Sequence, residues 1–178
     1  MPPHPFIEQA TLGDCRSIAE VHVLSWQHAY KDILPAEYLA ALSVERREAM
    51  WRESIANRQP QVLVARSEGG IDGFAAFGPS RDSGADAHCA ELWAIYLAPS
   101  AWSRGIGRTL WLAALERMRA SSFRSVSLWV LAGNGRAIKF YTAAGFKADA
   151  TSAKDFTMGG VKLQEVRYVL YSDDQAVI

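Results

Sequence analysis

The spacing of apolar and polar residues along this chain predicts strands that alternate with helices. Apolar residues at helical spacing predict a first helix that is capped by Thr11 or Asp14 and runs to about Tyr30. The same spacing predicts further helices over residues 35–42, 44–57, 106–119 and 134–144. Apolar runs between turn residues predict strands over 6–9, 61–66, 71–77, 88–97, 126–131 and 165–171, with an interrupted strand from Phe146. Helices between strands indicate an α/β (α+β) fold built on one mixed sheet.

One stretch stands out because it combines a buried strand with a glycine-led helix. Leu92–Leu97 is an unbroken apolar run, and Gly105 and Gly107 then open a long helical pattern. Glycines at a helix start let the backbone approach a ligand, and the unpaired N–H groups there favour an anion. Arg104 and Arg108 add positive charge. The stretch therefore predicts a phosphate cradle, although a single Gly-x-Gly at a helix start is also common without any ligand.

Two familiar phosphate fingerprints do not fit this stretch. The dinucleotide motif requires a third glycine where Leu110 stands, and the P-loop requires a Gly-Lys-Ser/Thr tripeptide that the chain lacks. A phosphate site consequently needs a second signal elsewhere in the sequence.

Composition narrows the class of protein. Lys plus Arg and Asp plus Glu number 19 each, and this balance argues against a nucleic-acid partner. Cys15 and Cys89 are too few for a disulfide framework, and their spacing fits no metal site. We expect no membrane span, because no apolar run approaches the necessary length. The first residues lack the pattern of a signal peptide, so a cytoplasmic location is the default expectation.

The second signal is the segment from Asn134 to Phe146. Asn134 and Tyr141 lie seven residues apart, which is two helical turns, so they share one helix face. Taken alone, Asn134 can be a simple helix cap and Tyr141 a core residue.

With both segments in place, the sequence resembles the GNAT superfamily of acetyl-CoA-dependent N-acetyltransferases. The family's phosphate loop, Gln/Arg-x-x-Gly-x-Gly/Ala, corresponds to Trp102–Gly107, with Trp102 in place of Gln or Arg. The family's segment Asn-x-x-Ala-x-x-Phe-Tyr-x-x-x-Gly-Phe is matched at each named position from Asn134 to Phe146. The resemblance implies a single GNAT-like domain over residues 1–178, ordered over about 6–171. It also implies a mostly antiparallel sheet with a splayed central parallel strand pair and helices on both faces.

The resemblance also implies a set of ligand contacts, with acetyl-CoA as cosubstrate and no metal. The expected cofactor-binding residues are Ile95, Tyr96, Leu97, Trp102, Ser103, Arg104, Gly105, Ile106, Gly107, Arg108, Asn134 and Tyr141. The first three would follow the pantetheine arm. Gly105, Gly107 and Arg108 would hold the pyrophosphate, and Asn134 would touch the pantetheine.

The implied reaction is direct acetyl transfer to a primary amine of a small molecule or peptide. Such an amine is mostly protonated near neutral pH, so a proton acceptor is required. Glu91 is our candidate, because it precedes the apolar strand and can face the cleft at its entry; Asp86, His88 and Glu165 are weaker candidates. The resemblance places Tyr141 near the sulfur, where its phenol can protonate the leaving thiolate.

Other parts of the site remain open. A backbone N–H of Ile95 or Tyr96 is the expected oxyanion donor. Aromatic residues of the N-terminal helices are candidates for an amine pocket, namely His22, Trp26, His28, Tyr30 and Trp51. We expect the remaining large indoles, Trp93, Trp111 and Trp129, to serve packing.

Two other functions compete with catalysis, and the acceptor is not determined. A non-catalytic acyl-CoA-binding or sensor domain would keep the phosphate loop without needing an acid or a base. A structural domain with a fortuitous Gly-x-Gly would bind no ligand, and the final strand is compatible with a homodimer. The run from Ser25 to Pro35 resembles a subgroup of small bacterial acetyltransferases, some of which act on polyamines or small amine-bearing toxins.

Overall fold

The structure is a computed structural model that describes residues 5–171. The helices are η1 (Leu12–Asp14), α1 (Cys15–Ala29), α2 (Ala36–Ala40), α3 (Val44–Asn57), η2 (Pro99–Ala101), α4 (Ile106–Ala120) and α5 (Gly135–Ala143). The strands are β1 (Phe6–Gln9), β2 (Gln61–Ser67), β3 (Gly70–Pro79), β4 (Cys89–Leu97), β5 (Ser125–Leu131), β6 (Lys147–Ala148), β7 (Lys154–Met158) and β8 (Val161–Tyr171).

The strands form one eight-stranded sheet in the order β1-β2-β3-β4-β5-β8-β6, with β7 paired to β8. Within residues 5–171, β4 and β5 form the only parallel pair, and every other pairing is antiparallel. The mixed, mostly antiparallel sheet with a central parallel pair is therefore confirmed.

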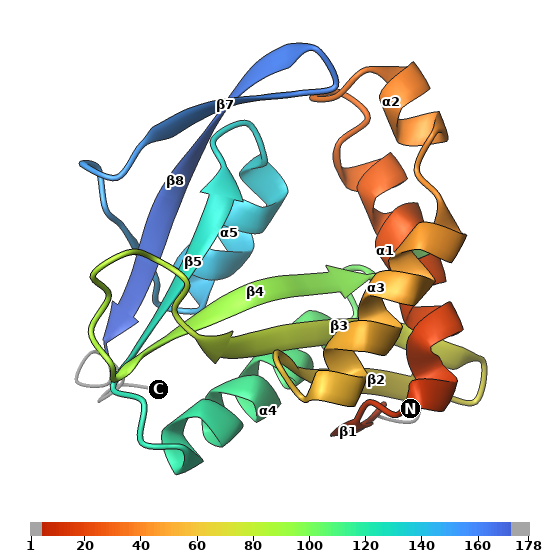
Figure 1. The fold of residues 1–178 in the computed structure, drawn as a ribbon, viewed down its shortest axis with the longest axis horizontal. Coiled ribbons are helices and arrows are strands. Elements are labelled where there is room, and N and C mark those ends of the chain that lie inside the picture. The colour runs from red at the N-terminus through yellow and green to blue at the C-terminus, as the bar shows by residue number, and fades with distance from the viewer. Residues whose placement is uncertain (1–4, 172–178) are drawn as a thin grey trace.

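Alternation along the central strands builds two cores on opposite faces of the sheet. On β2, Val62 and Val64 pack with α1 and α3, whereas Leu63 and Ala65 pack with residues of α4 such as Leu110. Side chains two residues apart on a strand share a face, so this sequence buries both faces. Figure 1 shows α1 and α3 on one side of β2–β4 and α4 on the other, which confirms helices on both faces.

The hairpin of β7 and β8 reaches from the sheet to α2 (Figure 1). Met158 and Leu163 of this hairpin pack with Tyr30 and Leu39 of the N-terminal helices. At the hairpin turn, a Cβ on Gly159 would lie 2.9 Å from Tyr38 Cγ, so only glycine permits this close approach. The expected last strand over 165–171 was too short, because β8 begins at Val161.

The parallel pair is short and then parts. Three ladder pairs join β4 to β5, of which the last is Glu91 with Ser127. On its other edge, β4 pairs Leu92 with Phe77 and Ala94 with Ala76, so Trp93 is the extra residue of a β-bulge. A bulge bends the strand that carries it, and beyond Glu91 the strands β4 and β5 share no ladder.

Gly73 of β3 holds the parted end of β4 in place, and Gly73→Ala tests this contact. A Cβ at this position would lie 2.8 Å from the Tyr96 carbonyl oxygen and 2.9 Å from Leu97 Cγ. We expect the free energy of unfolding to fall by about 1–3 kcal/mol, because backbone must move.

Gly78→Ala on the same strand is the matched control, since its Cβ would meet Trp93 at an ordinary 3.6 Å. This control should gain about 0.4–1 kcal/mol from lower entropy of the unfolded chain. Urea unfolding of both variants measures the difference, and equal stabilities would contradict the proposed constraint.

Candidate active site

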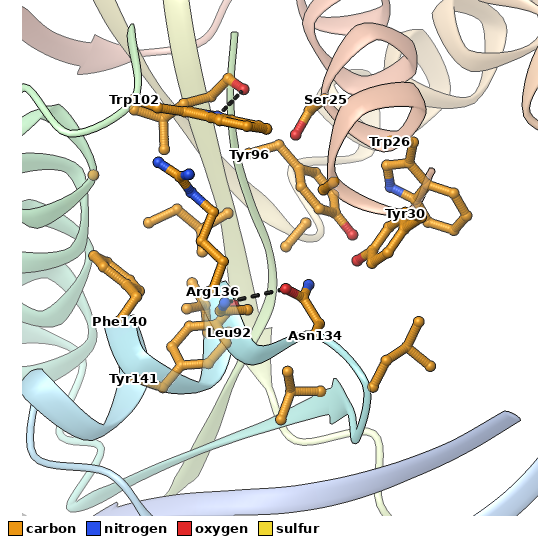
Figure 2. A pocket seen from close by; sticks show the side chains of 18 of the residues that line it. Ser25, Trp26, Tyr30, Leu92, Tyr96, Trp102, Asn134, Arg136, Phe140 and Tyr141 are labelled. Atoms are coloured by element: carbon orange, nitrogen blue, oxygen red, sulfur yellow. Dashed lines mark hydrogen bonds between the residues drawn. The ribbon is translucent and has the colours of Figure 1, made fainter. Parts of the chain in front are cut away.

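A cavity of about 400 Å³ opens where β4 and β5 part. It brings together ten of the twelve residues expected to bind a cofactor: Ile95, Tyr96, Leu97, Trp102, Ser103, Gly105, Gly107, Arg108, Asn134 and Tyr141. Asn134 and Tyr141 reach it from the same face of α5, as their spacing predicts (Figure 2). Tyr96 and Trp102 approach from the opposite side.

The glycine loop at one end of the cavity leaves the start of α4 open. Gly105 is the N-cap of α4 with φ of 81°, and Ser103 also has a positive φ of 60°. A Cβ placed on Gly105 would meet nothing within 4 Å, so the space in front of the helix start is open. The first turn of α4 leaves N–H groups unpaired at this point, and its dipole adds positive potential.

Two expected contact residues do not line the cavity. The side chain of Ile106 is buried in the core beneath α4, since it lies on the apolar stripe of that helix. Arg104 is exposed, in the loop before Gly105.

Arg136 is a functional candidate that the sequence analysis missed. Its guanidinium lies 4.1 Å from the centroid of the Trp102 ring, and it donates a hydrogen bond to Ser103 Oγ at 3.2 Å. The Trp102 indole in turn donates to the Leu97 carbonyl oxygen at 3.0 Å (Figure 2). Trp102 stands where the family motif has Gln or Arg, and α5 thus supplies a cation beside that position. The available signal in the sequence was Trp102 itself, an aromatic residue at a motif position that is Gln or Arg in the family.

Tyrosine hydroxyls collect in the middle of the cavity. Tyr30 and Tyr96 point their hydroxyls toward each other near Asn134 (Figure 2). Burial raises the pKa of Tyr141, and the neighbouring Tyr96 raises it further. Burial likewise raises the pKa of Tyr30 and of Tyr96. These phenols therefore stay protonated at neutral pH, and each retains a proton to donate.

His22 supports Tyr96 from behind and does not enter the cavity. The His22 ring stacks on Tyr96 with centroids 5.0 Å apart, and its Nδ1 accepts a hydrogen bond from Trp51 Nε1 at 3.1 Å. Burial lowers the pKa of His22 to about 3, so the ring is neutral. Of the N-terminal aromatic candidates, Trp26 and Tyr30 line the cavity, whereas His22 and Trp51 belong to the core.

Glu91 does not lie at the cleft entry, where the sequence analysis places it. It still lies within the parallel ladder, where its side chain is only 2% exposed. Its carboxylate accepts hydrogen bonds from the Arg81 backbone N–H and from the Arg81 guanidinium. The parting of the strands begins one residue later, so Leu92 and not Glu91 reaches the cavity.

Glu165 is the carboxylate that lines the cavity. It lies on β8 opposite Leu131, at the parted end of β5. Burial raises the pKa of Glu165, and the nearby carboxylates of Asp82 and Glu91 raise it too, while Lys154 and Arg81 oppose the shift.

Asp86 and His88 lie away from the cavity. Both belong to the exposed loop before β4, where the His88 N–H donates to Asp86 Oδ1 at 2.7 Å. Neither residue lines the opening between the strands, so Glu165 is the strongest candidate for the proton acceptor.

The far end of the cavity is aromatic and apolar. Trp93 and Trp129, for which the sequence analysis predicts a packing role, line it together with Phe156 and Met158 of β7. Trp111 is buried beneath α4, in agreement with its expected packing role. The bulge explains Trp93, because it changes the face to which that side chain points.

Two kinds of feature, a cluster of metal-ligating side chains and a membrane-spanning helix, were sought in the described part of the chain. Residues 5–171 contain no cluster of three or more His, Cys, Asp or Glu side chains placed to hold a metal ion. Among these residues, no helix combines the length and the hydropathy needed to cross a membrane.

Comparison with known proteins agrees with this geometry. The sequence model described as the acetyltransferase (GNAT) family matches residues 23–146. An uncharacterized N-acetyltransferase of Bacillus subtilis, YuaI, is 35% identical over 161 residues, which span 90% of this chain and 89% of that protein.

Two further relatives come from Thermoplasma acidophilum. A spermidine N(1)-acetyltransferase is 30% identical over 159 residues, which span 85% of this chain and 94% of that protein. The crystal structure of the PaiA N-acetyltransferase in complex with coenzyme A superposes with a TM-score of 0.72 at 25% identity, covering 90% of this chain and 96% of that one.

Proposed function

This chain belongs to the GNAT family of acetyltransferases, and on that premise we propose that it moves an acetyl group from acetyl-CoA directly to a primary amine of a small molecule or peptide. The observation that supports this proposal is the cavity between the parted strands. An anion site at the start of α4 lies at one end, and a protonated phenol and a carboxylate lie along its walls.

The residues along the cavity fit the shape and charge of acetyl-CoA. Gly105 and Gly107 would bring backbone N–H groups to the pyrophosphate, and Arg108 and Arg136 would add positive charge on either side. The edge of β4 beyond Glu91 has no partner in β5, so its backbone groups can bond the amides of the pantetheine arm.

The side chains supply the two proton transfers that the reaction needs. The amine nitrogen forms a bond to the acetyl carbon, and the bond from that carbon to sulfur breaks. We assign Glu165 as acceptor of the amine proton, because it lines the cavity and Glu91 does not. Tyr141 would give its proton to the departing thiolate and regain a proton from the nitrogen as the amide forms. A backbone N–H of Ile95 or Tyr96 would stabilise the oxyanion.

Gly105→Glu tests the phosphate loop. A carboxylate would enter the open space before α4 and repel the pyrophosphate, so we expect binding of coenzyme A to weaken by at least about 100-fold. Isothermal titration calorimetry measures the affinity. Gly84→Glu is the matched control, because Gly84 has a similar φ of +74° with nothing near its Cβ and lies outside the cavity lining. Normal binding by Gly105→Glu would disprove the loop assignment.

Tyr141→Phe tests the thiolate acid. Removal of one hydroxyl should lower kcat by about 100-fold or more while coenzyme A affinity stays nearly constant, because the ring and its packing remain. Thiol release from acetyl-CoA in the presence of amines measures kcat. Tyr168→Phe is the control, a half-buried β8 tyrosine outside the cavity lining. An unchanged rate in Tyr141→Phe would remove this residue from the mechanism, and binding without turnover of any amine by the native protein would favour the sensor function.

Glu165→Gln tests the proton acceptor. Below its raised pKa the carboxyl is protonated and cannot take a proton, so kcat/KM should fall on the acid side at a pH above the ordinary carboxyl value of about 4.3. The Gln variant should lose this acid limb and about 100-fold in kcat/KM.

Two further variants make the assignment of the proton acceptor specific. Asp155→Asn changes an acid of the adjacent strand that bonds Gln164 Nε2 at 2.9 Å, and it should keep the native profile. Glu91→Gln should lower thermal stability, because a buried partner of Arg81 is lost, while the acid limb remains. Loss of the acid limb in Glu91→Gln but not in Glu165→Gln would return the role to Glu91.

A further inference from the structure

The far end of the cavity carries one acid on an apolar floor. Strand register places Leu131, Glu165 and Lys154 in one row across β5, β8 and β7. Residues two apart on each strand share this face, and they include Trp129 on β5 and Phe156 on β7. Among the described residues that line the cavity, Glu165 is the only carboxylate.

The two indoles at this end already carry cations of the chain itself. Lys154 Nζ lies 3.6 Å from the centroid of the Trp129 ring, and Arg81 Cζ lies 4.2 Å from that of Trp93. The aromatic faces that attract an ammonium are thus occupied by internal partners.

The carboxylate of Asp82 is also paired with groups of the chain itself. Asp82 accepts a hydrogen bond from Trp129 Nε1 at 2.9 Å and pairs with Arg167 at 3.4 Å. Arg167 also pairs with Asp149 at 2.8 Å. Lys154 also lies 3.9 Å from Asp82, and Arg81 pairs with Glu91. A cationic acceptor therefore finds Glu165 as its one carboxylate partner in the described lining.

We propose that the acceptor is a primary amine with a single positive charge on an apolar or aromatic body, and not a polyamine. The inference rests on the proposed function and specifies its substrate. One ammonium would bind Glu165 and lose its proton there, while the body packs on Phe156, Met158 and Leu131. A second ammonium along the same molecule would meet no free carboxylate in this lining, because Asp82 and Glu91 are already paired with Lys154 and Arg81. This sets the chain apart from its relative named as a spermidine acetyltransferase.

An amine panel tests the inference with the full-length protein and saturating acetyl-CoA. The panel contains 2-phenylethylamine and hexylamine as monoamines, spermidine and putrescine as polyamines, and a peptide with a free N-terminal alanine. We expect kcat/KM for 2-phenylethylamine to exceed that for spermidine by at least about 30-fold, which is the size of one uncompensated charge contact near a protein surface. Hexylamine should also exceed both polyamines.

Lys154→Gln gives an independent measurement on the same enzyme. The ratio of kcat/KM between 2-phenylethylamine and spermidine should fall several-fold, because Asp82 loses one of its cationic partners and can pair with a second ammonium. Lys162→Gln is the matched control, since Lys162 is an exposed lysine on β8 that register places on the opposite face, and it should keep the native ratio.

The outcomes separate the two proposals. Spermidine, putrescine or the peptide as the preferred acceptor would overturn the inference and leave acetyl transfer intact. An unchanged ratio in Lys154→Gln would also overturn it. Coenzyme A binding without acetylation of any amine would refute the proposed function itself.

Discussion

The parting of β4 from β5 is the constraint on which the rest of the structure depends. Two parallel strands normally bury each other's edges along their whole length, because unpaired backbone groups in an interior are costly. Here the ladder ends after three pairs, and the bulge at Trp93 bends β4 away. The cavity, its free strand edge and its access to α4 and α5 all follow from that bend. Gly73, against which the end of β4 rests, keeps the parted strand close to β3.

Side chains then set the chemistry of the opening. The glutamates Glu91 of β4 and Glu165 of β8 have different environments. Glu91 is paired with Arg81 within the ladder, whereas Glu165 faces the cavity and has a raised pKa. The charge of Glu91 contributes to that shift, so the residue affects the candidate proton acceptor without reaching the substrate. Burial also keeps Tyr141 protonated. The cavity walls therefore carry a carboxyl with a raised pKa, Glu165, and a phenol that keeps its proton, Tyr141.

The two ends of the cavity differ in origin. One end is built from the loop before α4 and the start of α5, both within the region matched by the family model. The other end is built from α1 and the β7–β8 hairpin, and the hairpin lies outside that matched region. Packing of Gly159 against Tyr38 fixes how far the hairpin reaches over the cavity. The shape of this end of the cavity thus depends on a contact between distant segments.

The sequence by itself determined most of the helices and strands and the place of the glycine loop beside the cavity. Periodicity located α3, α4 and the central strands closely, because their apolar stripes face a core directly. The positions of Gly105, Asn134 and Tyr141 were also readable, since helix starts and helix faces obey local spacing. Only the tertiary structure decided the remainder. Which of the two glutamates, Glu91 or Glu165, lines the cavity depends on where β4 leaves β5. A shift of one residue in that position changes which side chain of β4 reaches the opening. Cationic side chains lie over the rings of Trp102, Trp93 and Trp129, and each comes from a segment distant in the sequence, so local spacing does not predict these contacts. Local spacing fixes what each element presents, whereas pairing and packing between distant elements fix what those side chains meet.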